Sequence, residues 1–392
     1  MTIQTASRLG NVKEYYFSKK LREIDSLNKE GKNIINLGIG SPDLPPSPEV
    51  IKVLQDASAL PNVHGYQGYK GIPEFRNAIA NWYQKWYSVT VNADTEVLPL
   101  MGSKEGIMHI CMTYLEKGDK VLVPNPGYPT YSSNINLTGA EILPYNLSDK
   151  NDWQPDFEAI EKEDLSNVKL MFVNYPQMPT GKNGSIELFE KLVAFAKKHS
   201  ILLIHDNPYS FILNDHPISL LSIPGALDVA IELNSLSKSH NMAGWRLGML
   251  IAHSDRINEI LRFKSNMDSG MFKPLQLAAA KALELGKEWH EQVNEIYRSR
   301  RDKVYELLDL LDCTYSKDQV GMFMWAKIPS TYNNGIELAD DVLYKANVFI
   351  TPGSIFGSEG DKYIRISLCG DIQRFEDAIH RIESSTIINQ MK

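Results

Sequence analysis

The segment SLSKSHNMAGWRLG, residues 235–248, combines side chains that could act together on one ligand. Lys238 carries a primary amine, a group that condenses with carbonyl carbons and whose pKa responds strongly to its surroundings. Arg246 carries a guanidinium that can neutralise a phosphate, and the hydroxyls of Ser235 and Ser237 can donate hydrogen bonds to the same group. An amine beside a phosphate site predicts a cofactor that has both an aldehyde and a phosphate, as pyridoxal 5′-phosphate does.

Two other segments support this interpretation over a solvent-exposed loop. In LPLMGSKEGIMH an apolar run meets Gly102, Ser103 and Lys104 and then a helical pattern. The amides at such a helix start can hold a phosphate. In ILLIHDNPY, Asp206 and Tyr209 follow an apolar run, and the carboxyl end of a parallel strand is where such sheets bind ligands. The alternative for the first segment is an ordinary strand-turn-helix connection. The alternative for Asp206 in the second segment is a helix cap or turn residue.

The elements that must position these side chains follow from the pattern of apolar residues. Short apolar runs alternate with longer helical patterns between about residues 95 and 255, which predicts a mostly parallel sheet with both faces covered. Ser185 is a plausible N-cap for one of these helices. The run KEWHEQVNEIYRSRRDKVYELLDLL, at about residues 286–312, predicts one long helix. It leads to a second unit with the strand-like runs MFMWAKIP and YIRISLCG and a closing helix, DIQRFEDAIHRIESS.

Length, charge and composition narrow the class of protein. A chain of 392 residues exceeds one compact core, so two domains are expected. A net charge of −7 argues against nucleic acid or an anionic membrane as the main partner. Cys111, Cys313 and Cys369 form neither a C-x-x-C pair nor a disulfide framework, which suits a reducing cytoplasm. Neither an apolar leader segment nor an apolar run of 18 residues occurs, so we expect neither secretion nor membrane spanning.

Over nearly its whole length the chain resembles the class I and II aminotransferases of pyridoxal-phosphate fold type I. The matching motifs occur in the family's order: GSPD, Y-x-x-x-x-G-x-x-E-x-R, GSKEG, NPGYPTY, a P-T-G turn, D-x-x-Y, SLSK followed by GWRLG, and YIRISL. The resemblance implies an α/β fold. A large domain, residues 45–287, would hold a mostly parallel seven-stranded sheet flanked by helices, and residues 1–44 and 288–392 would form a smaller α+β domain.

The resemblance also implies how pyridoxal 5′-phosphate would be held. Lys238 would form the Schiff base and then carry the proton at the substrate Cα. Asp206 would pair with the pyridine nitrogen and keep it protonated, Tyr209 would hydrogen-bond the 3′-oxygen, and Tyr128 would stack on the ring. The phosphate would be held by the GSK segment of Gly102, Ser103 and Lys104 together with Ser235, Ser237 and Arg246.

The substrate and the partner subunit are expected to contact further residues. Tyr66 sits five residues before Gly71 and would reach the phosphate of a neighbouring subunit, which implies a homodimer with shared sites; a packing role is the alternative. Arg365 would grip the substrate α-carboxylate as a two-pronged fork, or else form a surface salt bridge. Gly40 would lie close to that carboxylate. A dinucleotide loop at GIGSPD is disfavoured because Asp43 replaces the third glycine.

One motif departs from the family. The chain reads QMPTG where the family reads N-P-T-G, and Met178 cannot donate to the 3′-oxygen as asparagine does. Tyr209 and a water could suffice, or Gln177 or Asn174 could substitute.

Side-chain recognition is expected to use residues near the N-terminus and a stretch of the partner subunit. The candidates are Tyr15, Tyr16 and Phe17, with Asn266 and Ser269. Lys264 could pair with a distal carboxylate but is more typical of a surface lysine.

The resemblance therefore implies an enzyme, an aminotransferase that moves an amino group from an L-amino acid to a 2-oxo acid by a ping-pong mechanism. Its motifs look most like the branch of LL-diaminopimelate and aspartate aminotransferases, so the substrate could be aspartate or glutamate, LL-diaminopimelate, or a broad set. A C–S β-lyase on the same fold is the alternative. A cofactor-binding regulator is disfavoured because no basic helix-turn-helix region is present. No metal spacing occurs, and His205 should face away from Asp206.

Overall fold

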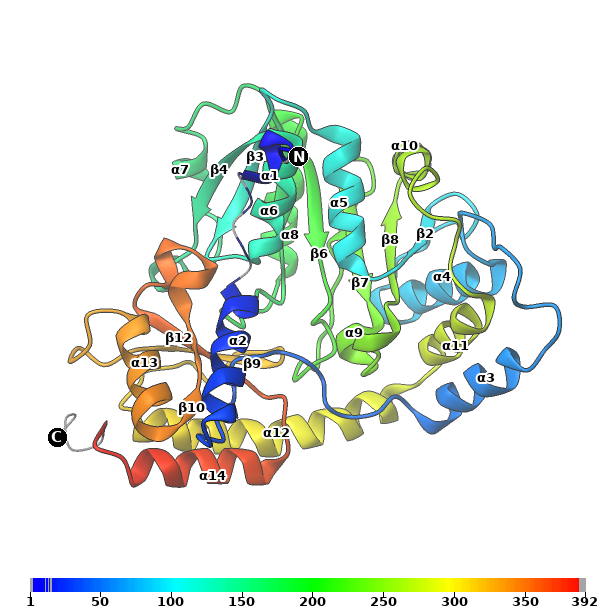
Figure 1. The fold of residues 1–392 in the computed structure, drawn as a ribbon. Helices are drawn as coiled ribbons and strands as arrows, with labels where there is room; N and C mark the ends of the chain where they lie inside the picture. Colours follow the sequence, from blue (N-terminus) through cyan, green and yellow to red (C-terminus); the bar gives the residue numbers. More distant parts are fainter. Residues whose placement is uncertain (1–2, 11, 13, 15, 388–392) are drawn as a thin grey trace.

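The apolar runs form a seven-stranded sheet in the computed structural model, which describes residues 3–10, 12, 14 and 16–387 (Figure 1). The strand order is β2–β8–β7–β6–β5–β3–β4. Only β8 runs antiparallel to its neighbours in this sheet, so the expected mostly parallel sheet is confirmed. The strand bounds are β2 Val97–Leu100, β3 Lys120–Asn125, β4 Glu141–Asn146, β5 Val168–Val173, β6 Leu202–Asp206, β7 Ala230–Ser235 and β8 Gly248–Ala252.

Helices cover both faces of this sheet because successive strand residues point to opposite sides. Leu203 packs in one buried cluster and Ile204 in another. Ser185 caps the predicted helix α8, since its side chain accepts from the Leu188 amide at 3.1 Å. None of the described helices is long and apolar enough to cross a membrane. The helices before and around the sheet are α1 Ser7–Gly10, α2 Tyr16–Lys29, α3 Pro48–Ser58, α4 Pro73–Tyr87, α5 Ser103–Tyr114, α6 Pro129–Thr138, α7 Phe157–Ile160, α8 Ile186–His199, α9 Leu236–Ser239, α10 Ser254–Lys264 and α11 Lys273–Leu283.

The strand directions bring distant segments to one edge of the sheet. The carboxyl ends of β2, β6 and β7 lead to Ser103, Asp206 and Lys238, respectively. Because β8 runs the other way, its amino end lies at the same edge, and Arg246 directly precedes it. Four residues from three separate sequence segments therefore meet at the edge where parallel sheets bind ligands.

The rest of the chain forms a second unit with its own buried core. Antiparallel β9 Phe323–Lys327, β11 Thr351–Pro352 and β12 Tyr363–Ser367 form one sheet, and β1 Ile35–Asn36 pairs with β10 Val348–Phe349. Phe17 and Leu37, from the N-terminal part, join the core that Phe375 occupies. The α+β character is as expected, whereas the division at residues 44 and 287 remains a prediction. The helices here are α12 Lys287–Leu310, α13 Gly335–Ala346 and α14 Ile372–Glu383.

The helix α12 confirms the long helix expected at about residues 286–312. Figure 1 shows it running along the base of the molecule beneath both sheets, with α14 beside it. Its buried face includes Val293 and Tyr297 toward its start and Leu307 and Leu308 toward its end. The spacing of these residues is that of one helical face, so a single element supports both parts of the fold.

We predict that Gly248→Ala destabilises the protein by about 1–3 kcal/mol, because overpacking against backbone cannot relax cheaply. A Cβ on Gly248 would lie 2.7 Å from the Ser103 amide nitrogen and 2.8 Å from the Gly102 carbonyl carbon. Denaturant unfolding of the cofactor-free protein measures the change. Gly10→Ala is the matched control, since its added methyl meets no atom within 4 Å. Equal stability of the two variants would contradict the prediction.

Candidate active site

A cavity of about 620 Å³ opens at this edge of the large sheet, between it and the second unit. It brings together most of the residues that the sequence singled out, from the motifs between GSPD and YIRISL except the one that contains Tyr66. Its lining comprises Phe17, Ser18, Leu21, Ile39, Gly40, Ser103, Lys104, Tyr128, Tyr131, Asn174, Met178, Asp206, Pro208, Tyr209, Ser235, Ser237, Lys238, Ala243, Arg246, Phe323, Phe356 and Arg365.

Lys238 reaches the cavity from the short helix α9, which directly follows β7. Its Nζ donates a hydrogen bond to the Gly40 carbonyl at 2.6 Å. Burial lowers the pKa of Lys238 to about 8, the Cys369 thiol opposes that shift, and the cations Arg365 and Arg246 add to it. A neutral amine is the nucleophilic form, so the cavity makes Lys238 reactive at mildly basic pH.

Asp206 presents an acceptor that the protein leaves unpaired. The carboxylate is buried, and its Oδ2 accepts from the Tyr131 hydroxyl at 2.9 Å. Its Oδ1 has no hydrogen-bond partner among the described residues. Burial raises the pKa of Asp206 to about 6, while the Tyr131 hydrogen bond and the charge of His205 oppose that rise. A buried orphan acceptor is costly, so this oxygen fits a ligand with a charged N–H donor, such as a pyridinium.

The other end of the cavity has the features of a phosphate cradle. Arg246 lies against Gly102, where a Cβ would sit 2.2 Å from its Nη2. Gly102 has φ +86°, a left-handed conformation that glycine adopts readily, and it precedes the first turn of α5. The Ser235 Oγ accepts from the Ser237 amide at 3.0 Å and donates to the Ser237 Oγ at 2.8 Å. A guanidinium, a helix start and hydroxyls around one space suit a phosphate.

Tyrosine side chains occupy the space between these two ends. Tyr128 and Tyr209 both line the cavity, as predicted. Burial raises the pKa of Tyr128, and nearby Arg246 and Arg365 partly oppose that rise. Tyr131 packs edge-on against Tyr128 with ring centroids 5.5 Å apart. The sequence interpretation missed Tyr131, although it lies in the NPGYPTY motif, three residues after Tyr128 and on the first turn of α6.

Arg365 projects from β12 and is 4% exposed, which excludes the surface salt bridge considered from the sequence. Its Nη2 donates to the Gly38 carbonyl at 2.8 Å. Its guanidinium carbon lies 3.9 Å from the ring centroid of Phe323, 4.6 Å from that of Phe356 and 5.6 Å from that of Phe17. These rings orient the guanidinium and keep water away from it. The sequence interpretation had no signal for Phe323 and Phe356, because only tertiary packing brings them to Arg365.

The structure shows what surrounds the departure from N-P-T-G. Met178 is buried, and its Sδ lies 3.3 Å from the Arg365 Nη1. Asn174 lines the cavity, where its Nδ2 donates to the Asp206 carbonyl at 2.6 Å and its Oδ1 accepts from the Met178 amide. Gln177 donates to the Pro126 carbonyl at 2.9 Å and is not part of the lining. Of the two amides considered as substitutes, only Asn174 therefore faces the cavity.

Some predicted residues lie elsewhere. Tyr66 is 96% exposed, and Asn266, whose Nδ2 donates to the Arg262 carbonyl, is not part of the lining. Tyr15 lies outside the described residues. The interpretation of Lys264 as a surface lysine is wrong, because it is buried and paired with Asp268. Among the described residues, no group of three or more His, Cys, Asp or Glu side chains could hold a metal ion.

Comparisons with known proteins agree with this geometry. A family model described as aminotransferase class I and II matches residues 32–382. The chain is 39% identical over 382 residues to an LL-diaminopimelate aminotransferase from Dehalococcoides mccartyi, covering 97% of this chain and 98% of that protein. An LL-diaminopimelate aminotransferase from Oleidesulfovibrio alaskensis is 39% identical over 386 residues, covering 97% and 98%. The solved structure of substrate-bound BacF from Bacillus subtilis superposes with a TM-score of 0.93, at 37% identity and 98% coverage of both chains.

We predict that the Lys238 amine of the cofactor-free protein titrates near pH 8, well below the ordinary 10.5 of a lysine. Because acylation requires the neutral amine, labelling with acetic anhydride at a series of pH values should show a midpoint near 8 in the peptide that contains Lys238. Peptides with exposed lysines from the same digest provide the internal reference. A midpoint at the reference value would show that the cavity does not perturb this amine.

Proposed function

Since the chain belongs to the class I and II aminotransferase family, we propose that the cavity residues act together in pyridoxal-phosphate-dependent amino transfer, and we infer the substrate class from the lining. The enzyme moves an amino group from an amino acid to a 2-oxo acid. The relatives named above carry no lyase name.

The residues of the cavity fit pyridoxal 5′-phosphate. The observation that carries this assignment is the orphan Oδ1 of buried Asp206, which would accept from the pyridine N–H. Arg246, Ser235, Ser237 and the GSK segment would hold the phosphate. Tyr209 would donate to the ring 3′-oxygen, and Tyr128 would lie against the ring. When bound, the cofactor supplies an aldehyde carbon and a cationic ring that draws electrons from the substrate Cα.

Lys238 holds and moves the protons of the reaction. Its pKa of about 8 places the amine near the operating pH of a general base. Its Nζ donates to the Gly40 carbonyl, and Lys238 lines the same cavity as Asp206 and Arg365. Lys238 would take the proton from the substrate Cα. It would then deliver a proton to the carbon on the other side of the transferred amino nitrogen.

Arg365 would bind the α-carboxylate and thereby orient the Cα–H bond toward Lys238. Its Nη2 bond to the Gly38 carbonyl and the three phenyl rings fix the plane of the guanidinium before substrate arrives. A preset fork matches a carboxylate with two parallel hydrogen bonds. Enclosure by rings strengthens this pairing because it excludes water.

The wall beside Arg365 supports substrates with apolar or aromatic side chains. Phe17 and Leu21 of α2, Ile39, and the rings of Phe323 and Phe356 surround this end of the cavity. Among the described residues, the charged groups that line the cavity are Arg365 and the residues assigned above to the cofactor, which are Lys104, Asp206, Lys238 and Arg246. Burying a second substrate charge among apolar side chains would be costly. The alternative substrate is LL-diaminopimelate, which the names of the relatives support.

The surface segments around Tyr66 and Gly270 support a homodimer. A Cβ on Gly270 would lie 2.6 Å from the Gly68 carbonyl oxygen, and the His64 and Phe272 rings stack at 5.8 Å. The two segments that were expected to reach a partner therefore lie side by side, outside their own cavity. In this proposal Tyr66 of each subunit completes the other's phosphate site. Three buried free cysteines support a reducing cytoplasm as the compartment.

We predict that loaded enzyme mixed with an amino acid alone releases one equivalent of 2-oxo acid and retains the nitrogen on the cofactor. Lys238→Ala should slow this half-reaction by about 100- to 10,000-fold, the usual range for a lost general acid-base group. Stopped-flow absorbance and 2-oxo-acid analysis measure it. Lys191→Ala, on the exposed face of α8, is the control. Release of ammonia with pyruvate from a sulfur amino acid, without a second 2-oxo acid, would indicate β-elimination instead.

We predict that kcat/KM for phenylalanine, methionine or leucine exceeds that for aspartate and LL-diaminopimelate by at least about tenfold. Leu21→Ala should reduce kcat/KM for these larger substrates by roughly 5- to 30-fold, since Leu21 is 38% exposed in the open cavity and a substrate that covers it would gain about 1–2 kcal/mol of apolar contact. Alanine, which is too short to reach Leu21, serves as the control substrate. Highest activity with LL-diaminopimelate would overturn the apolar class and leave the aminotransferase assignment intact.

A further inference from the structure

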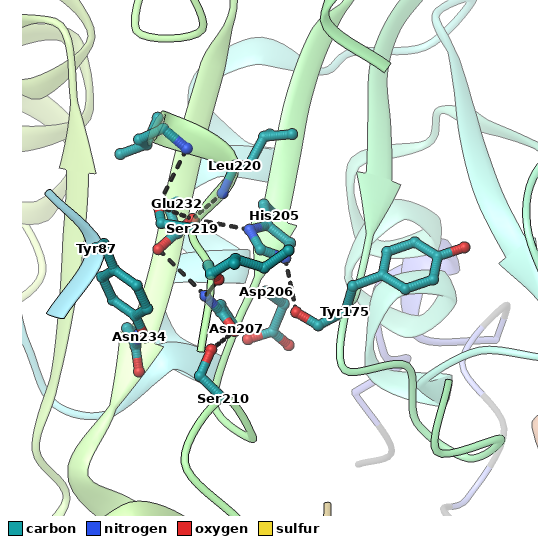
Figure 2. A network of polar contacts seen from close by, with 12 residues as sticks. Tyr87, Tyr175, His205, Asp206, Asn207, Ser210, Ser219, Leu220, Glu232 and Asn234 are labelled. Atoms are coloured by element: carbon teal, nitrogen blue, oxygen red, sulfur yellow. Dashed lines mark hydrogen bonds and ion pairs between the residues drawn. The ribbon is translucent and has the colours of Figure 1, made fainter. Parts of the chain in front are cut away.

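A histidine and a glutamate lie on two adjacent buried strands, and the histidine directly precedes Asp206 in the chain. His205 of β6 and Glu232 of β7 are register partners, and both are 0% exposed. The His205 Nδ1 lies 2.8 Å from the Glu232 Oε2 (Figure 2). Because strand residues alternate, His205 faces the α8 side, where Phe189 packs on its ring, and Asp206 faces the α6 side with Tyr131.

The contacts of Glu232 favour an ionised carboxylate. Its Oε2 accepts from the Ser219 hydroxyl at 2.7 Å and from the Leu220 amide at 3.1 Å. Its Oε1 accepts from the Tyr83 hydroxyl at 2.9 Å and from Asn207 at 3.4 Å. Figure 2 shows several of these bonds converging on the carboxylate. With His205 that makes five donors on two oxygens, and such a set stabilises the charged form.

The contacts of His205 then determine its protonation. Its Nε2 lies 3.0 Å from the Tyr175 carbonyl oxygen, which can only accept, so Nε2 carries a proton. Its Nδ1 lies 2.8 Å from the Glu232 Oε2, and an ionised Glu232 can only accept, so Nδ1 would then carry a proton as well. An imidazole with protons on both nitrogens is the cation.

We propose that Glu232 holds His205 as a buried imidazolium, and that this positive charge, one residue away on β6, makes His205 a positioning residue that keeps Asp206 ionised. The functional part of this proposal rests on the proposed role of Asp206. An ionised Asp206 is what a pyridinium needs as its partner, and a neutral carboxylic acid would bind it far less well.

The groups around Asp206 and His205 indicate that the His205 charge lowers the pKa of Asp206. Burial is the largest influence on Asp206 and raises its pKa, whereas the Tyr131 hydrogen bond and the His205 charge lower it. The titratable groups that face His205 are Glu232 and, through Glu232, Tyr83 of α4, whose pKa burial and Glu232 raise well above its usual range. The other contacts, from Ser219, Asn207 and Phe189, are uncharged. Neutralising His205 should therefore raise the pKa of Asp206 further.

The first test needs only the wild-type protein without cofactor. Nitrogen-15 NMR of protein with labelled histidine, at pH 8, should show one of the nine histidines with both ring nitrogens protonated. A free histidine is neutral at that pH. Loss of this signal in His205→Gln assigns it. An unprotonated ring nitrogen on His205 at pH 8 would overturn the proposal.

The second test measures the effect on Asp206. Carbon-13 NMR of labelled aspartate, assigned with Asp206→Asn, should give a carboxyl midpoint near 6 in the wild-type protein. In His205→Gln that midpoint should rise by at least about one pH unit. His199→Gln is the matched control, since it removes another histidine paired with a carboxylate, Glu161, before the amino end of β6. An unchanged midpoint in His205→Gln would refute the influence on Asp206.

Both tests use the cofactor-free chain, so their outcome is separate from that of the amino-transfer assays. A charged His205 in a protein without transaminase activity would refute the proposed function and leave the proposal about His205 intact. A neutral His205 in an active transaminase would sink this proposal alone. If His205→Gln fails to fold, the wild-type spectrum at pH 8 still decides the protonation of His205.

Discussion

The site depends on a buried carboxylate that the protein only half satisfies. Asp206 accepts one hydrogen bond from Tyr131, and its other oxygen has no partner among the described residues. Burying an acceptor in this state costs free energy unless a ligand completes it. The other features of the cavity can be understood from this constraint, because they define the shape, charge and direction of the group that would complete it.

The large sheet determines where the groups of the cavity lie relative to one another. Parallel strands carry Ser103, Asp206 and Lys238 to one edge, and the reversed strand β8 brings Arg246 back to the same place. The distance between the phosphate cradle and the carboxylate is therefore set by strand order and not by any flexible loop. Gly102 and Gly248 allow the backbones to approach closely there, since side chains at either position would collide with their neighbours. A rigid edge of this kind positions groups more accurately than a surface loop does.

The segment Gly38–Asp43 joins this edge to the second unit. Gly38 accepts from Arg365, Gly40 accepts from Lys238, and Asp43 forms a two-bond ion pair with the largely buried Arg300 of α12, at 2.7 and 2.8 Å. One short stretch thus links Arg365, Lys238 and the long helix that supports both units. Because Arg300 also donates to the Leu368 carbonyl, the strand that carries Arg365 is tied to the same point. Arg365 and Lys238 are consequently held by the same short segment.

The sequence alone determined the chemistry of this protein and the elements that carry it. Lys238, Asp206 and Arg246 could be identified because their residue types lie beside strand ends, and the helical and strand periods are local properties of the chain. Arg365 followed from the resemblance to the aminotransferase family. The long α12 and the capped α8 followed from the same local signals.

Only the tertiary structure decided which side chains surround those residues. The phenyl rings around Arg365 come from Phe17, Phe323 and Phe356. Phe17 is far from the other two in the sequence, and Phe323 and Phe356 lie in different elements, so no local pattern pairs these rings. The same is true of the Tyr131 bond to Asp206 and of the His205–Glu232 pair across two strands. Lys264 and Asp268 are only four residues apart, so the tertiary structure decided the burial of that ion pair and not its spacing. Contacts of this kind depend on strand order and packing, and these arise from the whole chain burying its apolar surface at once.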